Sequence, residues 1–201
     1  AYRRLSQALA PLNAPSFWLP GNHDGCDGAQ VDASHFMRHI TTTHWQICML
    51  NSQLADEVRG YLTAAELSAL AVAVDAANAA GRYLLVALHH PPVSIGCDWL
   101  DEQRVANAEA FFAELDRCDR AVAVICGHVH QDTLQERRGV QFFSTPSTCI
   151  QFAPRQVDFM LDDINPGFRW LELHPDGRLG TGVERVTAKT FPVDFESGGY
   201  L

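Results

Sequence analysis

The stretch that decides the fold is residues 83–92, YLLVALHHPP, in which an apolar run leads directly into two histidines and two prolines. Tyr83–Leu88 is apolar at five of its six positions, as is typical of a strand that is covered on both faces. Ala121–Cys126 (AVAVIC) is a second run of this kind, and Trp45–Leu50 and Ser16–Leu19 are also predicted to be strands. The sequence therefore predicts a sheet with a buried centre.

Helices and hairpins are predicted around these strands. Thr63-Ala-Ala-Glu66 has the pattern of a capping box, in which the Thr hydroxyl and the Glu carboxylate bind free amides at a helix start. This helix is expected to end near Gly81, and Asn107 is predicted to cap another helix. In the last third, RRG and HPDG are expected to be hairpin turns, and Phe168–Leu173 alternates like a half-solvated strand. This order of elements indicates an α/β domain with mixed sheets.

Length and composition fit one compact domain, which we expect to span residues 1–201. The hydrophobic fraction of 47% is enough for a sizeable core. The net charge of −9 and the pI near 5.4 disfavour binding of nucleic acid polymers, which needs a basic surface to displace counterions. A small anionic substrate remains compatible with this charge because bound metal ions reverse the local field.

The cysteines and the hydropathy indicate a cytoplasmic protein with no membrane partner. No cysteines form a C-x-x-C pair and several lie in apolar runs, so we expect buried, reduced thiols. No stretch of 18 apolar residues occurs, which argues against a membrane span, and the first residues lack the apolar region of a signal peptide. The six cysteines are Cys26, Cys48, Cys97, Cys118, Cys126 and Cys149.

Three histidine-bearing motifs each follow a predicted buried strand. They are Gly21–Asp24 (GNHD), His89–Pro92 (HHPP) and Gly127–His130 (GHVH). Because ligands bind at the carboxyl ends of strands in open α/β sheets, we expect these three loops to converge on one site. Imidazole and amide oxygen are suitable ligands for iron, manganese or zinc.

Local geometry adds two expectations for these motifs. His-x-His in an extended segment places two imidazoles on one face, where they serve two adjacent ions. Gly21 and Gly127 are expected to let the backbone turn sharply beside the site. Each motif taken alone also fits a structural role, and Asn-His-Asp is compatible with ordinary turn chemistry. The occurrence of all three in one short chain favours a metal site.

The remaining histidines and the acidic pairs are interpreted as structural or solvated. Three of these histidines are expected on or near a short polar helix and one at a hairpin turn. The residues are His35, His39, His44, His174, Asp98, Asp162 and Asp163.

The order GNHD, HHPP, GHVH resembles the later signature motifs of the calcineurin-like metallophosphoesterase superfamily. The segments WLPGNHD, GCDWLD, CGHVHQ and TPSTCIQF, with the GY before Leu201, are similar to the branch that hydrolyses 3′,5′-cyclic AMP in bacteria. The similarity covers essentially all 201 residues. It implies a four-layer α/β/β/α sandwich of two mixed sheets.

The resemblance also implies roles for individual residues. Asn22, His89 and His128 would be ligands of one metal ion, and His130 a ligand of its neighbour. His23 would face the phosphate and assist departure of the leaving group, with Asp24 orienting it. His90 is expected on the substrate side or behind the ligands.

The activity implied by the resemblance is hydrolysis of cyclic AMP to AMP by a metal-activated hydroxide at a dinuclear centre. The two ions would be iron (Fe²⁺/Fe³⁺) or Mn²⁺, with Zn²⁺ also suitable. The motifs recognise only phosphate and metal, so another phosphodiesterase or phosphatase of the superfamily stays open. The native metal, the residues that hold adenine and the oligomeric state are left open as well.

One departure from the family pattern is large. The family's Asp-x-His and Gly-Asp-x-x-Asp motifs, which precede the Asn-His motif, do not occur in this sequence. We therefore expect an N-terminal truncation that removes the first strands, leaves one metal ion or none, and impairs catalysis. A non-catalytic remnant without the first metal site is the alternative.

Overall fold

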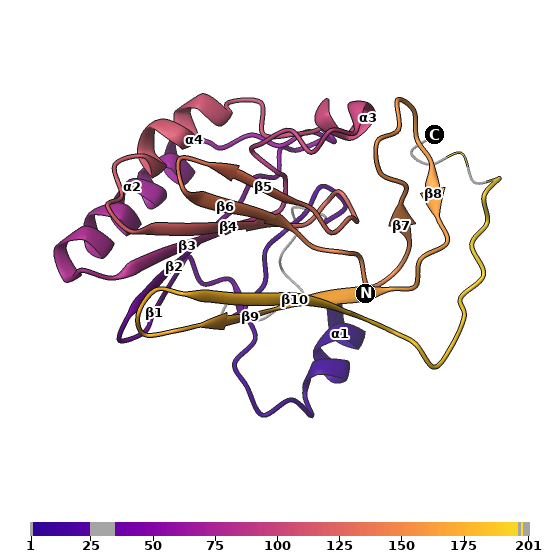
Figure 1. Ribbon diagram of the computed structural model, residues 1–201, viewed down its shortest axis with the longest axis horizontal. Helices are drawn as coiled ribbons and strands as arrows, with labels where there is room; N and C mark the ends of the chain where they lie inside the picture. The colour runs from indigo at the N-terminus through magenta and orange to yellow at the C-terminus, as the bar shows by residue number, and fades with distance from the viewer. Residues whose placement is uncertain (1, 25–34, 197, 199–201) are drawn as a thin grey trace.

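The computed structural model describes residues 2–24, 35–196 and 198, and its central element is a six-stranded sheet (Figure 1). The strand order is β1-β2-β3-β4-β6-β5. The four inner strands are parallel, and the two edge strands run antiparallel to their neighbours. The strands are β1 (His39–Thr41), β2 (Trp45–Leu50), β3 (Tyr83–Leu88), β4 (Ala121–Cys126), β5 (Leu134–Arg137) and β6 (Val140–Ser144).

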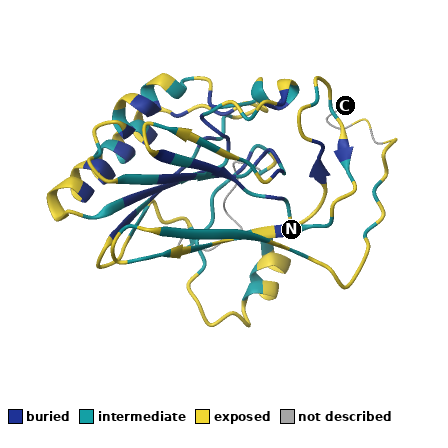
Figure 2. Ribbon diagram, viewed as in Figure 1, coloured by how far each residue is buried: buried dark blue, intermediate teal, exposed yellow. Residues whose placement is uncertain are grey.

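Helices α2 (Ala64–Ala80) and α4 (Ala108–Leu115) cover one face of this sheet, as Figure 1 shows. Their inward side chains join the main hydrophobic core with the inward residues of β2, β3 and β4. Figure 2 shows the resulting pattern, in which the inner strands are buried while the outer sides of the helices are exposed. Burial on both faces explains why β3 and β4 are apolar at nearly every position.

The helix boundaries follow the predicted signals in part. Thr63 Oγ1 accepts a hydrogen bond from Glu66 N at 3.3 Å, and Gly81 ends α2 with φ of 63°. The other half of the capping box does not form, because the Glu66 carboxylate accepts from Asn51 N at 2.9 Å and pairs with Arg38 at 2.5 Å. Thr63 therefore caps α2 as predicted, whereas the Glu66 carboxylate holds Asn51 and Arg38, which lie outside the helix.

The opposite face of the sheet is covered by a hairpin of β9 (Gly167–Leu173) and β10 (Leu179–Arg185). Its apolar side packs on a second core cluster that includes Trp45 and Phe143. Trp45 Nε1 donates a hydrogen bond to the His174 carbonyl at 2.9 Å, which ties the hairpin turn to the sheet. The predicted α/β class is confirmed. Among the described residues, the second layer of strands is this antiparallel pair.

The remaining elements lie outside these layers. They are helix α1, the short helix α3, and a ribbon of β7 and β8 that pairs antiparallel. Their bounds are α1 (Tyr2–Leu9), α3 (Asp98–Asp101), β7 (Gln151–Phe152) and β8 (Leu161–Asp162). In the part of the chain that the structure describes, no helix has the length and apolar character needed to cross a membrane.

Several local predictions are wrong, each because tertiary contacts replace the local signal. Ser16–Leu19 is not a strand; its Trp18 N–H bonds the His35 carbonyl at 2.8 Å instead of a neighbouring strand. Asn107 occupies the N-cap position of α4 as predicted, but its side chain makes no capping bond and instead bonds both backbone groups of Leu62, at 2.8 and 2.9 Å. His39 lies on β1, which pairs with β2, and not on a helix.

The cysteine prediction holds for three of the described residues. Cys48, Cys97 and Cys126 are buried, whereas Cys118 is half-buried and Cys149 is exposed. All five are free thiols. The sixth cysteine, Cys26, lies outside the described residues. The GY pair before Leu201, which contributed to the family resemblance, also lies outside them.

Candidate metal centre

Two of the three motifs lie at the carboxyl ends of adjacent parallel strands. The last pair of β3 and β4 is Leu88 with Cys126, so the loops that follow these strands leave the sheet side by side. Gly127 N donates to the His89 carbonyl at 3.0 Å and joins the two loops directly. This placement is the convergence that the strand order predicts.

Three lone-pair atoms meet at this edge, and we call them the ligand triangle: Asn22 Oδ1, His89 Nε2 and His128 Nδ1. Asn22 Oδ1 lies 3.0 Å from His89 Nε2 and 3.1 Å from His128 Nδ1, and the two nitrogens are 3.3 Å apart. Ligands bound at about 2.0–2.2 Å with angles between tetrahedral and right angles lie roughly 2.8–3.6 Å apart. The ligand triangle therefore fits a single metal ion.

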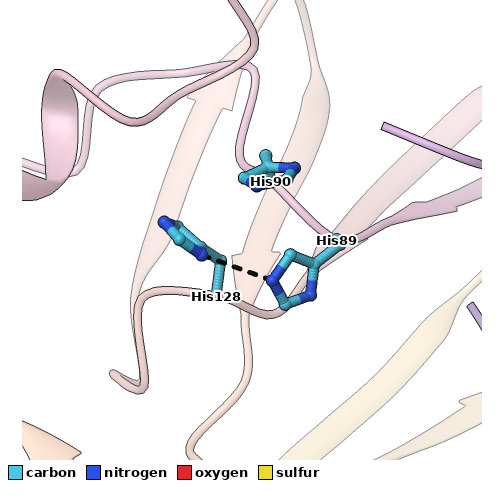
Figure 3. A group of neighbouring side chains, drawn as sticks. All are labelled: His89, His90 and His128. Carbon is cyan, nitrogen blue, oxygen red and sulfur yellow. Dashed lines mark hydrogen bonds between the residues drawn. The ribbon is translucent and has the colours of Figure 1, made fainter. Parts of the chain in front are cut away.

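The protonation state of the imidazoles also suits a cation. Burial, followed by repulsion from neighbouring histidines, lowers the pKa of His89 to about 3 and that of His128 to about 2. Both rings are consequently neutral near pH 7 and offer lone pairs, which is the form that binds metals. Figure 3 shows these two rings directed at one another, with His90 beside them.

His90 lies close to His89 and His128, and the three form a group of histidines that could hold a metal ion. The partners of the His90 ring, however, differ from those of the other two. Its side chain is fully buried, with Nδ1 2.9 Å from Ser52 Oγ and Nε2 3.0 Å from the Val58 carbonyl. Because the carbonyl accepts, Nε2 carries the proton and the Ser52 hydroxyl donates to Nδ1. Both ring nitrogens are therefore engaged within the protein, which favours a place behind the ligands and disfavours the expected contact with substrate.

His130 lies next to the ligand triangle rather than in it. The φ angles of His128 and His130 are 63° and 48°, so this segment is not extended and the expected one-face arrangement of His-x-His is wrong. The His130 ring stacks on Phe152, with centroids 4.3 Å apart. Its Nδ1 is buried without a hydrogen-bond partner among the described residues, and burial lowers the pKa of His130 to about 4. A buried, uncharged and unpartnered nitrogen suits a metal ligand.

The loop that carries Asn22 is held in place by Asp24. One carboxylate oxygen of Asp24 accepts from Gly21 N at 2.7 Å, and the other accepts from the Tyr2 hydroxyl. Burial and this hydrogen bond raise the pKa of Tyr2 to about 12. These partners favour a role for Asp24 in fixing the turn, whereas the sequence suggested that it orients His23.

His23 is exposed to solvent. Burial is the largest cause of the lowered pKa of His89, His128 and His130, and repulsion from His23 is the smallest, so His23 lies in the electrostatic neighbourhood of these rings. His23 is thus the exposed histidine of this group, whereas His128 is buried and His89 and His130 are half-buried.

Gly21 matters through the absence of a side chain and not through a positive φ, whereas Gly127 shows neither feature. Neither Gly21 nor Gly127 has a positive φ. A Cβ on Gly21 would lie 2.6–2.9 Å from three atoms of the His89 ring, whereas a Cβ on Gly127 would lie 3.5 Å from His89 Nδ1. The first distance is a clash and the second is an ordinary contact.

This difference gives a matched pair of variants. Gly21→Ala is expected to displace the His89 ring and to lower the free energy of unfolding by about 1–3 kcal/mol through overpacking. Gly127→Ala is expected to leave the position of His89 and the free energy of unfolding nearly unchanged. Chemical denaturation measures the stability, and calorimetric titration with Mn²⁺ measures the site. Equal effects of the two substitutions would show that His89 has room to move.

The sequence reading missed three residues that support the histidines. Gln103 Oε1 lies 2.8 Å from His128 Nε2, and Ser52 holds His90. A Cβ on Gly60 would lie 2.6 Å from His90 Cβ and Cγ. None of the three lies in a histidine motif, and residue type alone does not distinguish them from other polar or small residues.

The fold and the site geometry define a class of protein, and comparison with known families agrees. Residues 1–132 match the model of the calcineurin-like phosphoesterase family. The chain belongs to this family of metal-dependent phosphoesterases.

Characterised relatives are similar along nearly the whole chain. The 3′,5′-cyclic adenosine monophosphate phosphodiesterase CpdA of Pseudomonas aeruginosa is 40% identical over 203 aligned residues, covering 100% of this chain and 74% of the relative. CpdA of Escherichia coli K12 is 38% identical with the same coverage. The 3′,5′-cyclic-nucleotide phosphodiesterase alr5338 of a Nostoc species is 34% identical, covering 92% of this chain and 71% of that protein.

Proposed function

We propose that this chain hydrolyses a phosphodiester, with 3′,5′-cyclic AMP as the substrate and AMP as the product. The observation that carries the proposal is the ligand triangle, whose 3.0–3.3 Å edges match one bound metal ion. Relatives of up to 40% identity over the full chain are named for this reaction. The free thiols of the described residues support a reducing compartment, the cytoplasm.

Each residue of the site has a proposed part in the reaction. Asn22, His89 and His128 hold the ion, for which Fe²⁺/Fe³⁺, Mn²⁺ and Zn²⁺ all accept these ligands. A bound ion supplies Lewis-acid activation of the phosphoryl group and lowers the pKa of a coordinated water. His23, which is exposed, donates a proton to the leaving oxygen, a role that imidazole performs near neutral pH.

His130 is proposed as a ligand of a second, neighbouring ion. Its buried and unpartnered Nδ1 supports this role. The carboxylates that the family's first two motifs would add do not occur in these 201 residues. We therefore propose that these 201 residues by themselves bind one ion weakly, leave the second site empty and turn over substrate slowly.

A metal titration combined with a substrate panel tests the proposal. We expect one Mn²⁺ per chain by calorimetry and by elemental analysis of protein purified without chelator. We expect slow hydrolysis that prefers cyclic AMP to cyclic GMP and to bis(p-nitrophenyl) phosphate, and that EDTA removes. Full-rate turnover with two ions per chain would contradict the single-ion proposal, and absence of any metal binding would contradict the site.

A metal-binding protein without turnover is the second candidate, because the ligand triangle by itself accounts for binding of an ion and not for turnover. The DNA that precedes the codon of the first residue separates the two. An in-frame segment that encodes Asp-x-His and Gly-Asp-x-x-Asp supports the hydrolase, and the longer polypeptide should then be fast. A stop codon at that place favours the second candidate.

A further inference from the structure

Gln103 lies outside every histidine motif and yet contacts a ring of the ligand triangle. Its Oε1 lies 2.8 Å from Nε2 of His128, on the side of the imidazole opposite the triangle. We propose that Gln103 is a positioning residue that fixes the tautomer of His128, so that Nδ1 offers its lone pair to a divalent cation. This inference rests on the proposed function, since it assigns a purpose to the same site.

The argument follows from counting protons on one ring. An amide oxygen only accepts hydrogen bonds, so the nitrogen that faces it must carry hydrogen. A neutral imidazole has one such hydrogen, and with Nε2 protonated Nδ1 is bare. Nδ1 is the atom that lies 3.1 Å from Asn22 Oδ1 and 3.3 Å from His89 Nε2. The other tautomer would place an N–H where the cation belongs.

The backbone around Gln103 is tied down on several sides. Gln103 N donates to the Leu100 carbonyl at 3.0 Å, and its own carbonyl accepts from Gly60 N at 3.3 Å. The preceding helix α3 is anchored by Asp101, whose carboxylate accepts from Ile95 N at 2.8 Å and from Gly96 N at 3.2 Å. The segment GCDWLD, which ends at Asp101, therefore anchors the backbone that leads into Gln103.

The same loop also connects with the second buried histidine. Gly60, which binds the Gln103 carbonyl, leaves no room for a Cβ beside His90. Metal-binding histidines commonly donate their other N–H to an acceptor that fixes the ring and its tautomer. Here the acceptor is a neutral amide, which orients the imidazole without adding negative charge behind it.

Three substitutions at this position separate positioning from packing. Gln103→Leu and Gln103→Met remove the acceptor and keep most of the volume, while Gln103→Glu keeps an acceptor oxygen. Gln135→Leu on the edge strand β5 is the matched control for losing a glutamine. Two-bond ¹H–¹⁵N spectra of histidine-labelled protein report the tautomer without metal, and Zn²⁺ titration reports affinity.

We expect His128 to be protonated at Nε2 in the parent chain, in Gln103→Glu and in Gln135→Leu. In Gln103→Leu and Gln103→Met we expect a mixture of tautomers and Zn²⁺ affinity lower by about 10- to 100-fold. An unchanged tautomer in both apolar variants would overturn the inference, as would a tautomer change in Gln135→Leu.

The two proposals fail in different ways. If the parent chain binds no Zn²⁺, the proposed function is wrong, and the spectra of the metal-free chain still decide the role of Gln103. If the parent chain binds Zn²⁺ and both apolar variants bind it equally well, the positioning role is wrong while the metal site stands.

Discussion

His128→Ala is expected to lower the affinity of the chain for Mn²⁺ or Zn²⁺ by more than about 100-fold, since residues that merely support a ligand already contribute 10- to 100-fold. The substitution removes one corner of the ligand triangle and leaves Asn22 Oδ1 and His89 Nε2, 3.0 Å apart, as two ligands. Hydrolysis of cyclic AMP should fall with it. Calorimetric titration measures the first effect and product chromatography the second.

His44→Ala is the matched control for this experiment. His44 is exposed on the turn between β1 and β2, away from the three histidine motifs in the chain. Its substitution should leave metal affinity unchanged. Retention of the parent chain's affinity in His128→Ala would remove this residue from the metal site, and with it the basis of the proposed reaction.

Trp45→Ala is expected to destabilise the fold by about 3–5 kcal/mol, the usual cost of truncating a buried aromatic residue. The Trp45 side chain is 2% exposed in the cluster between the central sheet and the β9–β10 hairpin. The substitution leaves a cavity there and also removes the hydrogen bond to the His174 carbonyl. Urea denaturation followed by circular dichroism measures the change.

Trp45→Phe separates the two contributions. It keeps an aromatic ring in the cluster and removes the Nε1 donor, so the expected loss is about 1 kcal/mol from the hydrogen bond plus a small packing term. A loss in Trp45→Phe as large as in Trp45→Ala would mean that the hydrogen bond, rather than the packed ring, holds the hairpin on the sheet.

The parts of the fold that the sequence predicts well are those with strong local signals. Tyr83–Leu88 and Ala121–Cys126 are apolar because both faces are buried, and they form β3 and β4 with the predicted bounds. Gly81 ends its helix in the left-handed region as predicted. Burial and backbone conformation restrict the residue types at these positions, so both can be predicted from a single sequence.

The contacts that were not predicted join residues that are distant in sequence, and only the tertiary fold brings these residues together. Asn107 looks like a helix cap, but its amide bonds Leu62, 45 residues away. Gln103 reaches His128 across 25 residues, and Ser52 reaches His90 across 38. Nothing in the local sequence of a glutamine or a serine specifies which distant ring it will meet.

The three corners of the ligand triangle are far apart along the polypeptide: His89 lies 67 positions after Asn22, and His128 lies 106 positions after it. An unfolded chain would have to close both loops to bring them together, so a cation recognises the native state almost exclusively. Binding of the cation then stabilises the native state by mass action. At a free cation concentration of 100 times the dissociation constant, it adds about 2.7 kcal/mol to the free energy of unfolding. Removal of the bound cation would thus lower the stability of the native chain by the same amount.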